Sequence, residues 1–214
     1  MKLLLIGNSH TYYNAMPETL RRLLEATGYK PQVTMLAVGG KDLAYHASTP
    51  NTTVNLRCGG YDAVIAQDRA SAFDEGAFRT GARLLKEKVD KVGARFHLFM
   101  PWTARNNRAA QSEMTEGYLA FCRANDCSFA PVGEVFGRIL QSEDTSLLYN
   151  EDGKHASPIG SYLAAVTIFY TVTGRKRVIN IDTINDPGVA AGFPTELCQR
   201  IHTEACRMSR LYNG

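Results

Sequence analysis

The chain has 214 residues, of which 44% are hydrophobic and 21% are charged, and its formal net charge at pH 7 is +3. This balance is typical of a globular chain with its own core, and it excludes the collagen-like, disordered and disulfide-scaffold classes. Charges of both signs are interspersed without a basic block, so we expect no nucleic acid partner. One domain spanning residues 1–214 is the simplest organisation.

The five cysteines are scattered and contain no C-x-x-C pair, which favours reduced thiols over a zinc site or a disulfide framework. The apolar run at the N-terminus stops at Gly7 and is too short for the core of a signal peptide. No stretch approaches the roughly 18 consecutive apolar residues of a membrane span. We therefore expect a cytoplasmic protein with no membrane partner, while the oligomeric state stays open.

Short apolar runs alternate with amphipathic stretches along the chain. The run from Leu3 to Ile6 predicts a strand that is buried on both faces. Four further strands are predicted at residues 32–38, 62–66, 95–100 and 128–132. Helical spacing, proline at the first turn and glycine stops predict helices at residues 17–28, 74–92, 108–125, 133–141, 158–173 and 195–211.

Strands separated by helices in this order predict an α/β fold, a three-layer sandwich around a five-stranded parallel sheet. Right-handed crossovers and the strongly apolar first strand favour the flavodoxin-like strand order 2-1-3-4-5, with the first strand in the centre. Residues 175–194 have no clear period and are expected to be rich in loops.

Three residues in predicted loops have the chemistry of a nucleophilic site. Ser9 follows the first predicted strand, and Asp152 and His155 lie three residues apart in a loop near the end of the chain. A serine hydroxyl needs an adjacent base, and a histidine that a carboxylate orients can supply it. Taken alone, Ser9 is an ordinary turn serine, and Asp152 with His155 an ordinary loop ion pair. Their joint occurrence after strands of an α/β chain favours catalysis.

An acyl-transfer site also needs donors for the developing oxyanion. We expect these to be the backbone N–H groups of Ser9 and Gly40 and the side-chain amide of Gln67, which follows the third predicted strand. If Gln67 fills only a structural role, Asn106 and Asn107 are the next residues to test.

These motifs resemble those of the SGNH, or GDSL-like, hydrolases, a family of esterases and lipases. Gly7-Asn8-Ser9 is similar to the first family block, Gly39 or Gly40 supplies the second-block glycine, and Asp152-Gly153-Lys154-His155 is similar to the D-x-x-H block. The resemblance runs in order from Met1 to about Gly174. Where the family's third block reads G-x-N-D, this chain reads Ala66-Gln67-Asp68-Arg69, so Gln67 stands in place of the usual oxyanion asparagine.

The resemblance implies a serine esterase that removes a small acyl group, such as acetyl, from an alcohol or carbohydrate ester. Ser9 would be the nucleophile, His155 the base and Asp152 the residue that orients it, with no metal and no organic cofactor required. His10 and Trp102 are expected to contact this small-molecule ester substrate. The alternative is a binding domain without catalysis that uses the same crevice for a small polar ligand.

Overall fold

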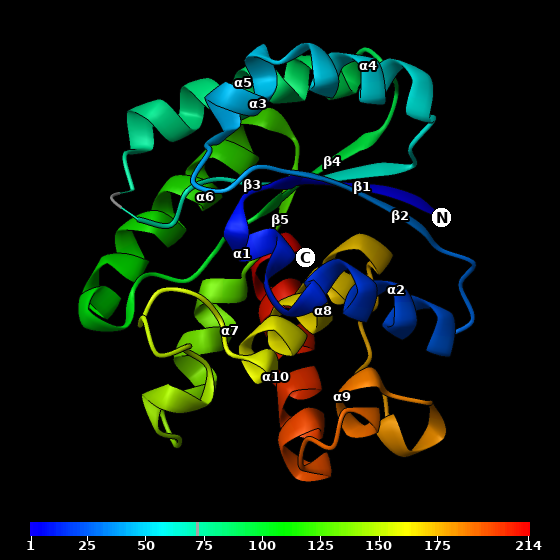
Figure 1. Ribbon diagram of the computed structural model, residues 1–214, viewed down its shortest axis with the longest axis vertical. Coiled ribbons are helices and arrows are strands. Elements are labelled where there is room, and N and C mark those ends of the chain that lie inside the picture. The colour runs from blue at the N-terminus through cyan, green and yellow to red at the C-terminus, as the bar shows by residue number, and fades with distance from the viewer. Residues whose placement is uncertain (72) are drawn as a thin grey trace.

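The computed structural model describes residues 1–71 and 73–214. Its strands are β1 (Lys2–Gly7), β2 (Gln32–Ala37), β3 (Ala63–Gln67), β4 (Arg95–Phe99) and β5 (Ser128–Ala130). They pair in parallel in the order β2-β1-β3-β4-β5 (Figure 1), which confirms the predicted sheet and places β1 between β2 and β3. The carboxyl ends of all five strands therefore meet at one edge of the sheet.

Helices cover both faces of the sheet (Figure 1). One face carries α3 (Leu43–Ser48), α4 (Pro50–Gly59), α5 (Glu75–Asp90) and α6 (Gln111–Asn125). The other face carries α2 (Met16–Ala26), α7 (Val132–Ile139), α8 (Pro158–Thr173) and α10 (Thr195–Asn213). The predicted three-layer architecture is thus confirmed.

The residues of β1 divide between two hydrophobic cores because successive strand side chains point to opposite faces. Leu3 and Leu5 pack with α2, α8 and α10, whereas Leu4 and Ile6 pack with α3, α5 and α6. All four are completely buried. This double burial explains why the sequence of β1 is a continuous apolar run rather than an alternating one.

The N-terminal end of α8 follows from local capping chemistry. The Ser157 hydroxyl accepts a hydrogen bond from the Gly160 N–H at 3.1 Å, and Pro158 occupies the first turn.

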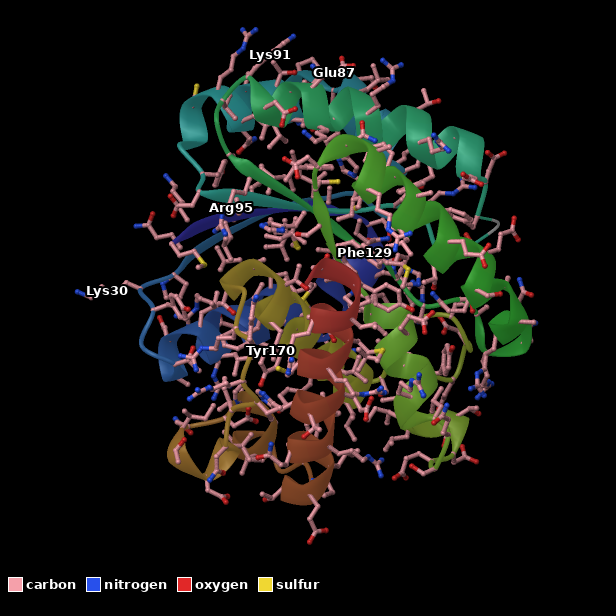
Figure 2. All side chains as sticks on the ribbon, turned by 180° about the vertical axis from the view of Figure 1, so that it is seen from behind. Lys30, Glu87, Lys91, Arg95, Phe129 and Tyr170 are labelled. Carbon is pink, nitrogen blue, oxygen red and sulfur yellow. The ribbon has the colours of Figure 1, made fainter. Side chains whose placement is uncertain are left out.

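In the layer on the opposite face of the sheet, α5 is amphipathic. Figure 2 shows Glu87 and Lys91, at the C-terminal end of this helix, pointing away from the sheet.

Several short elements lie where the sequence has no clear helical pattern. They include α1 (Ser9–Tyr12), α3, α4, α9 (Pro187–Ala190) and the 3₁₀ turns η1 (Tyr13–Ala15), η2 (Arg105–Ala110), η3 (Thr145–Leu147) and η4 (Ile181–Thr183). The helix predicted to begin at residue 108 begins at Gln111 instead, because η2 occupies the preceding residues. α4 has no continuous apolar stripe, and α1 is too short to show a period.

A buried polar cluster holds the segment 175–194 against the helical layer. Asp186 caps α9, and its Oδ1 also accepts a hydrogen bond from the Tyr162 hydroxyl at 2.9 Å. Its Oδ2 lies 3.1 Å from His202 Nε2 on α10, and His202 Nδ1 lies 3.0 Å from the Tyr170 hydroxyl. Tyr170 in turn accepts from the Ile179 N–H at 3.0 Å. The segment is therefore ordered by side-chain hydrogen bonds rather than by long elements of its own.

Within the described residues, no helix is both long enough and apolar enough to cross a bilayer. The five cysteines are free thiols.

Candidate active site

The turn after β1 places Ser9 at the carboxyl edge of the sheet as the first residue of α1. Asn8 caps this helix by accepting from the His10 N–H at 3.1 Å, and its Nδ2 donates to the Lys41 carbonyl at 2.9 Å. A β-carbon at Gly7 would lie 2.3 Å from Thr11 Oγ1, so only glycine permits the turn to pack this closely. The backbone around Ser9 is therefore fixed on both sides.

The loop before α8 is folded around the carboxylate of Asp152. Its Oδ1 accepts from the backbone N–H groups of Lys154 at 2.8 Å and His155 at 2.9 Å. Gly153 has φ 66°, a left-handed conformation that glycine adopts without steric cost. The Trp102 Nε1–H and the Arg105 N–H donate to the carbonyls of Lys154 and Gly153, respectively. These contacts anchor the loop to the segment that follows β4.

Ser9, His155 and Asp152 form one chain of hydrogen bonds. His155 Nδ1 lies 2.5 Å from Asp152 Oδ2, and His155 Nε2 lies 2.8 Å from Ser9 Oγ. Because an ionised carboxylate only accepts hydrogen bonds, Nδ1 is the donor. Nε2 is then the acceptor for the Ser9 hydroxyl, which is the tautomer that a general base requires.

The pKa of Asp152 keeps its carboxylate ionised at neutral pH. Burial acts to raise this pKa, but the hydrogen bonds from the His155 ring and from the Lys154 and His155 N–H groups outweigh it and lower the pKa to about 2. A fixed negative charge therefore faces the side of the imidazole opposite Ser9.

Two residues outside the predicted triad and oxyanion donors also hold the site together. The Tyr13 ring stacks on the His155 imidazole with centroids 4.1 Å apart and planes inclined by 6°. Asn14 adopts φ 50°, and its Nδ2 donates to the Ala156 carbonyl and to the Ser161 hydroxyl, both at 2.9 Å. The one sequence feature that points to this contact is an asparagine shortly after the serine turn, because asparagine tolerates a left-handed backbone conformation.

A small cavity of about 160 Å³ opens beside the Ser9 hydroxyl. Its lining comes from the turns that follow β1, β2, β3 and β4 and from the loop before α8: Asn8, Ser9, His10, Gly40, Arg69, Ala70, Ser71, Ala104, Lys154 and His155. Several of these side chains are short, so the space next to the nucleophile is limited by backbone and methyl groups. A larger cavity of about 870 Å³ includes Ser128, at the amino end of β5, and has no residue in common with the first.

His10 lines the cavity, as predicted from the sequence, and its ring centroid lies 5.4 Å from that of His155. Burial and the neighbouring His155 lower the pKa of His10 to about 4. The ring is therefore neutral at pH 7 and contributes no positive charge to the cavity.

The structure places Trp102 in the core rather than at the cavity, which corrects its expected contact with substrate. Its side chain is 1% exposed and stacks on Phe136 with centroids 4.3 Å apart. The physical reason is that the indole packs beneath the 152–155 loop and uses its N–H to hold the Lys154 carbonyl. Trp102 thus supports the site from behind.

Gln67 is likewise directed away from the space above Ser9. Its side chain is completely buried and does not line the cavity. Oε1 accepts from the Asn8 N–H at 3.1 Å and from the Thr11 hydroxyl at 2.9 Å, while Nε2 donates to the Asp68 carbonyl. In this arrangement the Asp68 carbonyl takes an N–H of the amide, and the contacts of Oε1 fix the turn that carries Ser9.

We expect Gln67→Met to lower the free energy of unfolding by about 1–3 kcal/mol, because it leaves the Asn8 N–H and the Thr11 hydroxyl buried without an acceptor. Urea denaturation measures this loss, with Gln32→Met, a change at an exposed position of β2, as the control. Unchanged stability together with a 10²- to 10³-fold fall in kcat would contradict this structural role and indicate that Gln67 is an oxyanion donor.

Two further histidines, in α3 and β4, make structural hydrogen bonds. His46 is buried, and its Nε2 donates to the Gly7 carbonyl at 2.8 Å. His97 lies in β4 with Nδ1 2.6 Å from the Ser128 hydroxyl. Within residues 1–71 and 73–214, no three His, Cys, Asp or Glu side chains gather closely enough to hold a metal ion.

No protein-family model and no curated protein matches the sequence. Solved structures do match its fold. The esterase EstA from Pseudoalteromonas sp. aligns with a TM-score of 0.63 and 12% identity, covering 81% of this chain and 97% of that one. A chain from Desulfitobacterium hafniense DCB-2, described as a lipolytic protein of the G-D-S-L family, aligns with a TM-score of 0.61 and 15% identity over 77% and 95% of the two chains.

A two-domain esterase active on acetylated mannans aligns with a TM-score of 0.63 and 15% identity, covering 81% of this chain and 49% of that one. These identities are low, and what the three structures share with this chain is the arrangement of strands and helices. The protein therefore has the fold of the SGNH, or GDSL-like, hydrolases.

Proposed function

We propose that the protein is a serine esterase of the SGNH type that removes a small acyl group from an alcohol. The observation that carries the proposal is the hydrogen-bonded chain from Ser9 Oγ through His155 to Asp152, with distances of 2.8 Å and 2.5 Å. This series of hydrogen bonds ends at a cavity on the carboxyl edge of the parallel sheet, which is where folds of this kind bind their ligands.

In the first half of the reaction, Ser9 Oγ attacks the ester carbonyl carbon while His155 Nε2 takes the hydroxyl proton. The C–O bond to the alcohol then breaks, and His155 returns the proton to the leaving oxygen. Asp152 holds the imidazole in place and stabilises its positive charge. In the second half, water attacks the acyl-enzyme through the same base, which releases the carboxylic acid and restores Ser9.

The oxyanion that forms at the carbonyl needs N–H donors. The Ser9 N–H belongs to the first residue of α1 and has no preceding helical turn to bond with. Gly40 also lines the cavity and supplies the second N–H of the proposal. Both are backbone groups, so they require no side-chain rearrangement during the reaction.

The size of the cavity supports a short acyl group such as acetyl. A volume of about 160 Å³ bounded by Gly40, Ala70 and Ala104 leaves room for a few heavy atoms next to Ser9. A long acyl chain would have to extend outside the cavity. The activity on acetylated mannans of one structural neighbour is consistent with this choice.

Labelling with a fluorophosphonate tests the nucleophile without knowledge of the substrate. We expect Ser9 Oγ to attack phosphorus with loss of fluoride, so that peptide mapping finds the adduct on Ser9. Ser112→Ala, a change at an exposed serine of α6, should label normally, whereas Ser9→Ala should not label. An adduct on Ser71, or no adduct on the folded protein, would contradict the esterase and favour a binding domain without catalysis.

A further inference from the structure

Positively charged side chains surround the mouth of the Ser9 cavity. Arg69 follows β3 and Lys154 precedes His155, and both line the cavity while remaining exposed. Arg105 is also exposed and packs against the same loop, since a β-carbon at Gly153 would lie 3.4 Å from its Nε. Arg69 and Lys154 therefore come from two segments that meet at this opening, and Arg105 lies beside the loop that carries Lys154.

Ion pairing within the described part of the chain leaves these three side chains available. The ion pairs among the described residues involve none of Arg69, Arg105 and Lys154. Asp152 is the acidic residue closest in sequence to Lys154, and both of its oxygens are occupied by the His155 ring and by backbone N–H groups. Arg69 and Lys154 are thus free to bind an external anion.

The carboxylate next to Arg69 in the sequence does not line the cavity. Asp68 is buried, and its Oδ1 accepts from the Leu43 N–H at 2.9 Å, away from the cavity lining. Burial raises the pKa of this carboxyl. The cavity consequently presents Arg69 and Lys154 without an acidic counterpart.

We propose that the substrate is an anionic ester, whose alcohol part carries a carboxylate or phosphate group that Arg69 and Lys154 bind. This inference rests on the proposed esterase function. The alcohol part is the one that carries the charge because His155 must reach the leaving oxygen to protonate it, and Lys154 is the neighbour of His155 in the chain. A guanidinium and an ammonium suit both oxyanion groups.

Three acetate esters of phenols test the proposal. Phenyl acetate is neutral, 3-acetoxybenzoate carries a carboxylate on the alcohol part, and 3-acetoxyphenyl phosphate carries a phosphate. After correction for alkaline hydrolysis rates, we expect kcat/KM to favour at least one anionic ester about 10- to 100-fold, the range of a charged hydrogen bond. The two anionic esters distinguish carboxylate from phosphate recognition, and added salt should reduce the preference.

Variants connect the preference to the two residues. Arg69→Met and Lys154→Met should each reduce the ratio of anionic to neutral kcat/KM by about tenfold or more. Lys91→Met, at the exposed end of α5, is the matched control and should retain the ratio. Binding of 3-hydroxybenzoate and of phenol to Ser9→Ala, measured by calorimetry, tests anion capture without chemistry, and the anion should bind more tightly.

Two kinds of failure can be told apart. Equal kcat/KM for neutral and anionic esters, or a preference that Arg69→Met and Lys154→Met leave intact, would overturn the anionic substrate while the esterase stands. Where 3-acetoxybenzoate is the preferred ester, failure of 3-hydroxybenzoate to bind Ser9→Ala more tightly than phenol would overturn the proposal independently of turnover. Absence of both ester hydrolysis and fluorophosphonate labelling would instead contradict the esterase.

Discussion

Ser9→Ala should reduce the kcat for 4-nitrophenyl acetate by at least about 10⁴-fold, because the variant has no oxygen nucleophile to form the acyl-enzyme. The fold should persist, since the Ser9 side chain makes one hydrogen bond, to His155 Nε2, and such a bond contributes about 1 kcal/mol. Steady-state kinetics measures the first effect, and circular dichroism with urea denaturation measures the second.

Ser112→Ala is the control for this experiment because Ser112 is an exposed serine of α6 outside the cavity. Its kcat should equal that of the unmodified protein. Retention of kcat in Ser9→Ala within tenfold would remove Ser9 from the reaction, and loss of kcat in both variants would indicate damage to the fold instead.

His202→Leu should lower the free energy of unfolding by about 3–5 kcal/mol, because it removes the side chain that pairs with Oδ2 of the buried Asp186 carboxylate. Both side chains of this pair are completely buried. Urea denaturation at pH 7 measures the loss. Thr203→Ala, an exposed change on the same helix, should stay within about 0.5 kcal/mol.

A double variant and a pH series show whether the loss of stability in His202→Leu comes from the Asp186 charge or from loss of packing. Asp186→Asn in the His202→Leu background should recover part of the stability, since it removes the unpaired charge. Burial acts to raise the pKa of Asp186, but the hydrogen bond and charge of His202 outweigh it and lower the pKa. The stabilisation therefore exists above the unfolded pKa of about 3.9 and is lost as the pH falls through the folded pKa.

The difference in stability between the unmodified protein and His202→Leu should consequently narrow as the pH falls below about 4. A loss that is constant with pH and is not recovered by Asp186→Asn would show that the imidazole acts through packing alone.

Local chemistry in the sequence was sufficient for much of the fold. Leu3 to Ile6 is apolar at every position because helices cover both of its faces, and Ser157 with Pro158 marks the start of α8 within the chain itself. Such patterns depend on residues next to each other, so the strands and long helices could be predicted. The joint occurrence of Ser9, Asp152 and His155 pointed to the site for the same reason, since each block lies within a few residues.

Contacts between distant residues decided the rest. Tyr13 stacks on His155, and Asn14 bonds to Ala156, across more than 140 positions of sequence. No local pattern predicts which aromatic ring meets the imidazole. The sequence likewise identified Gln67 and Trp102 as polar or aromatic groups after strands, but the direction of each side chain depends on the surroundings that the completed fold provides.

By itself, the sequence determined the order of strands and helices, the double burial of β1 and the residue types of a nucleophilic site, because hydrophobic periodicity and capping act over a few residues. Only the tertiary structure decided that Gln67 turns inward to hold the Asn8 turn, that Trp102 lies under the 152–155 loop, and that Arg69 and Lys154 meet at one opening. Side-chain direction and charge clustering arise from packing between segments far apart in the chain, which sequence spacing does not encode.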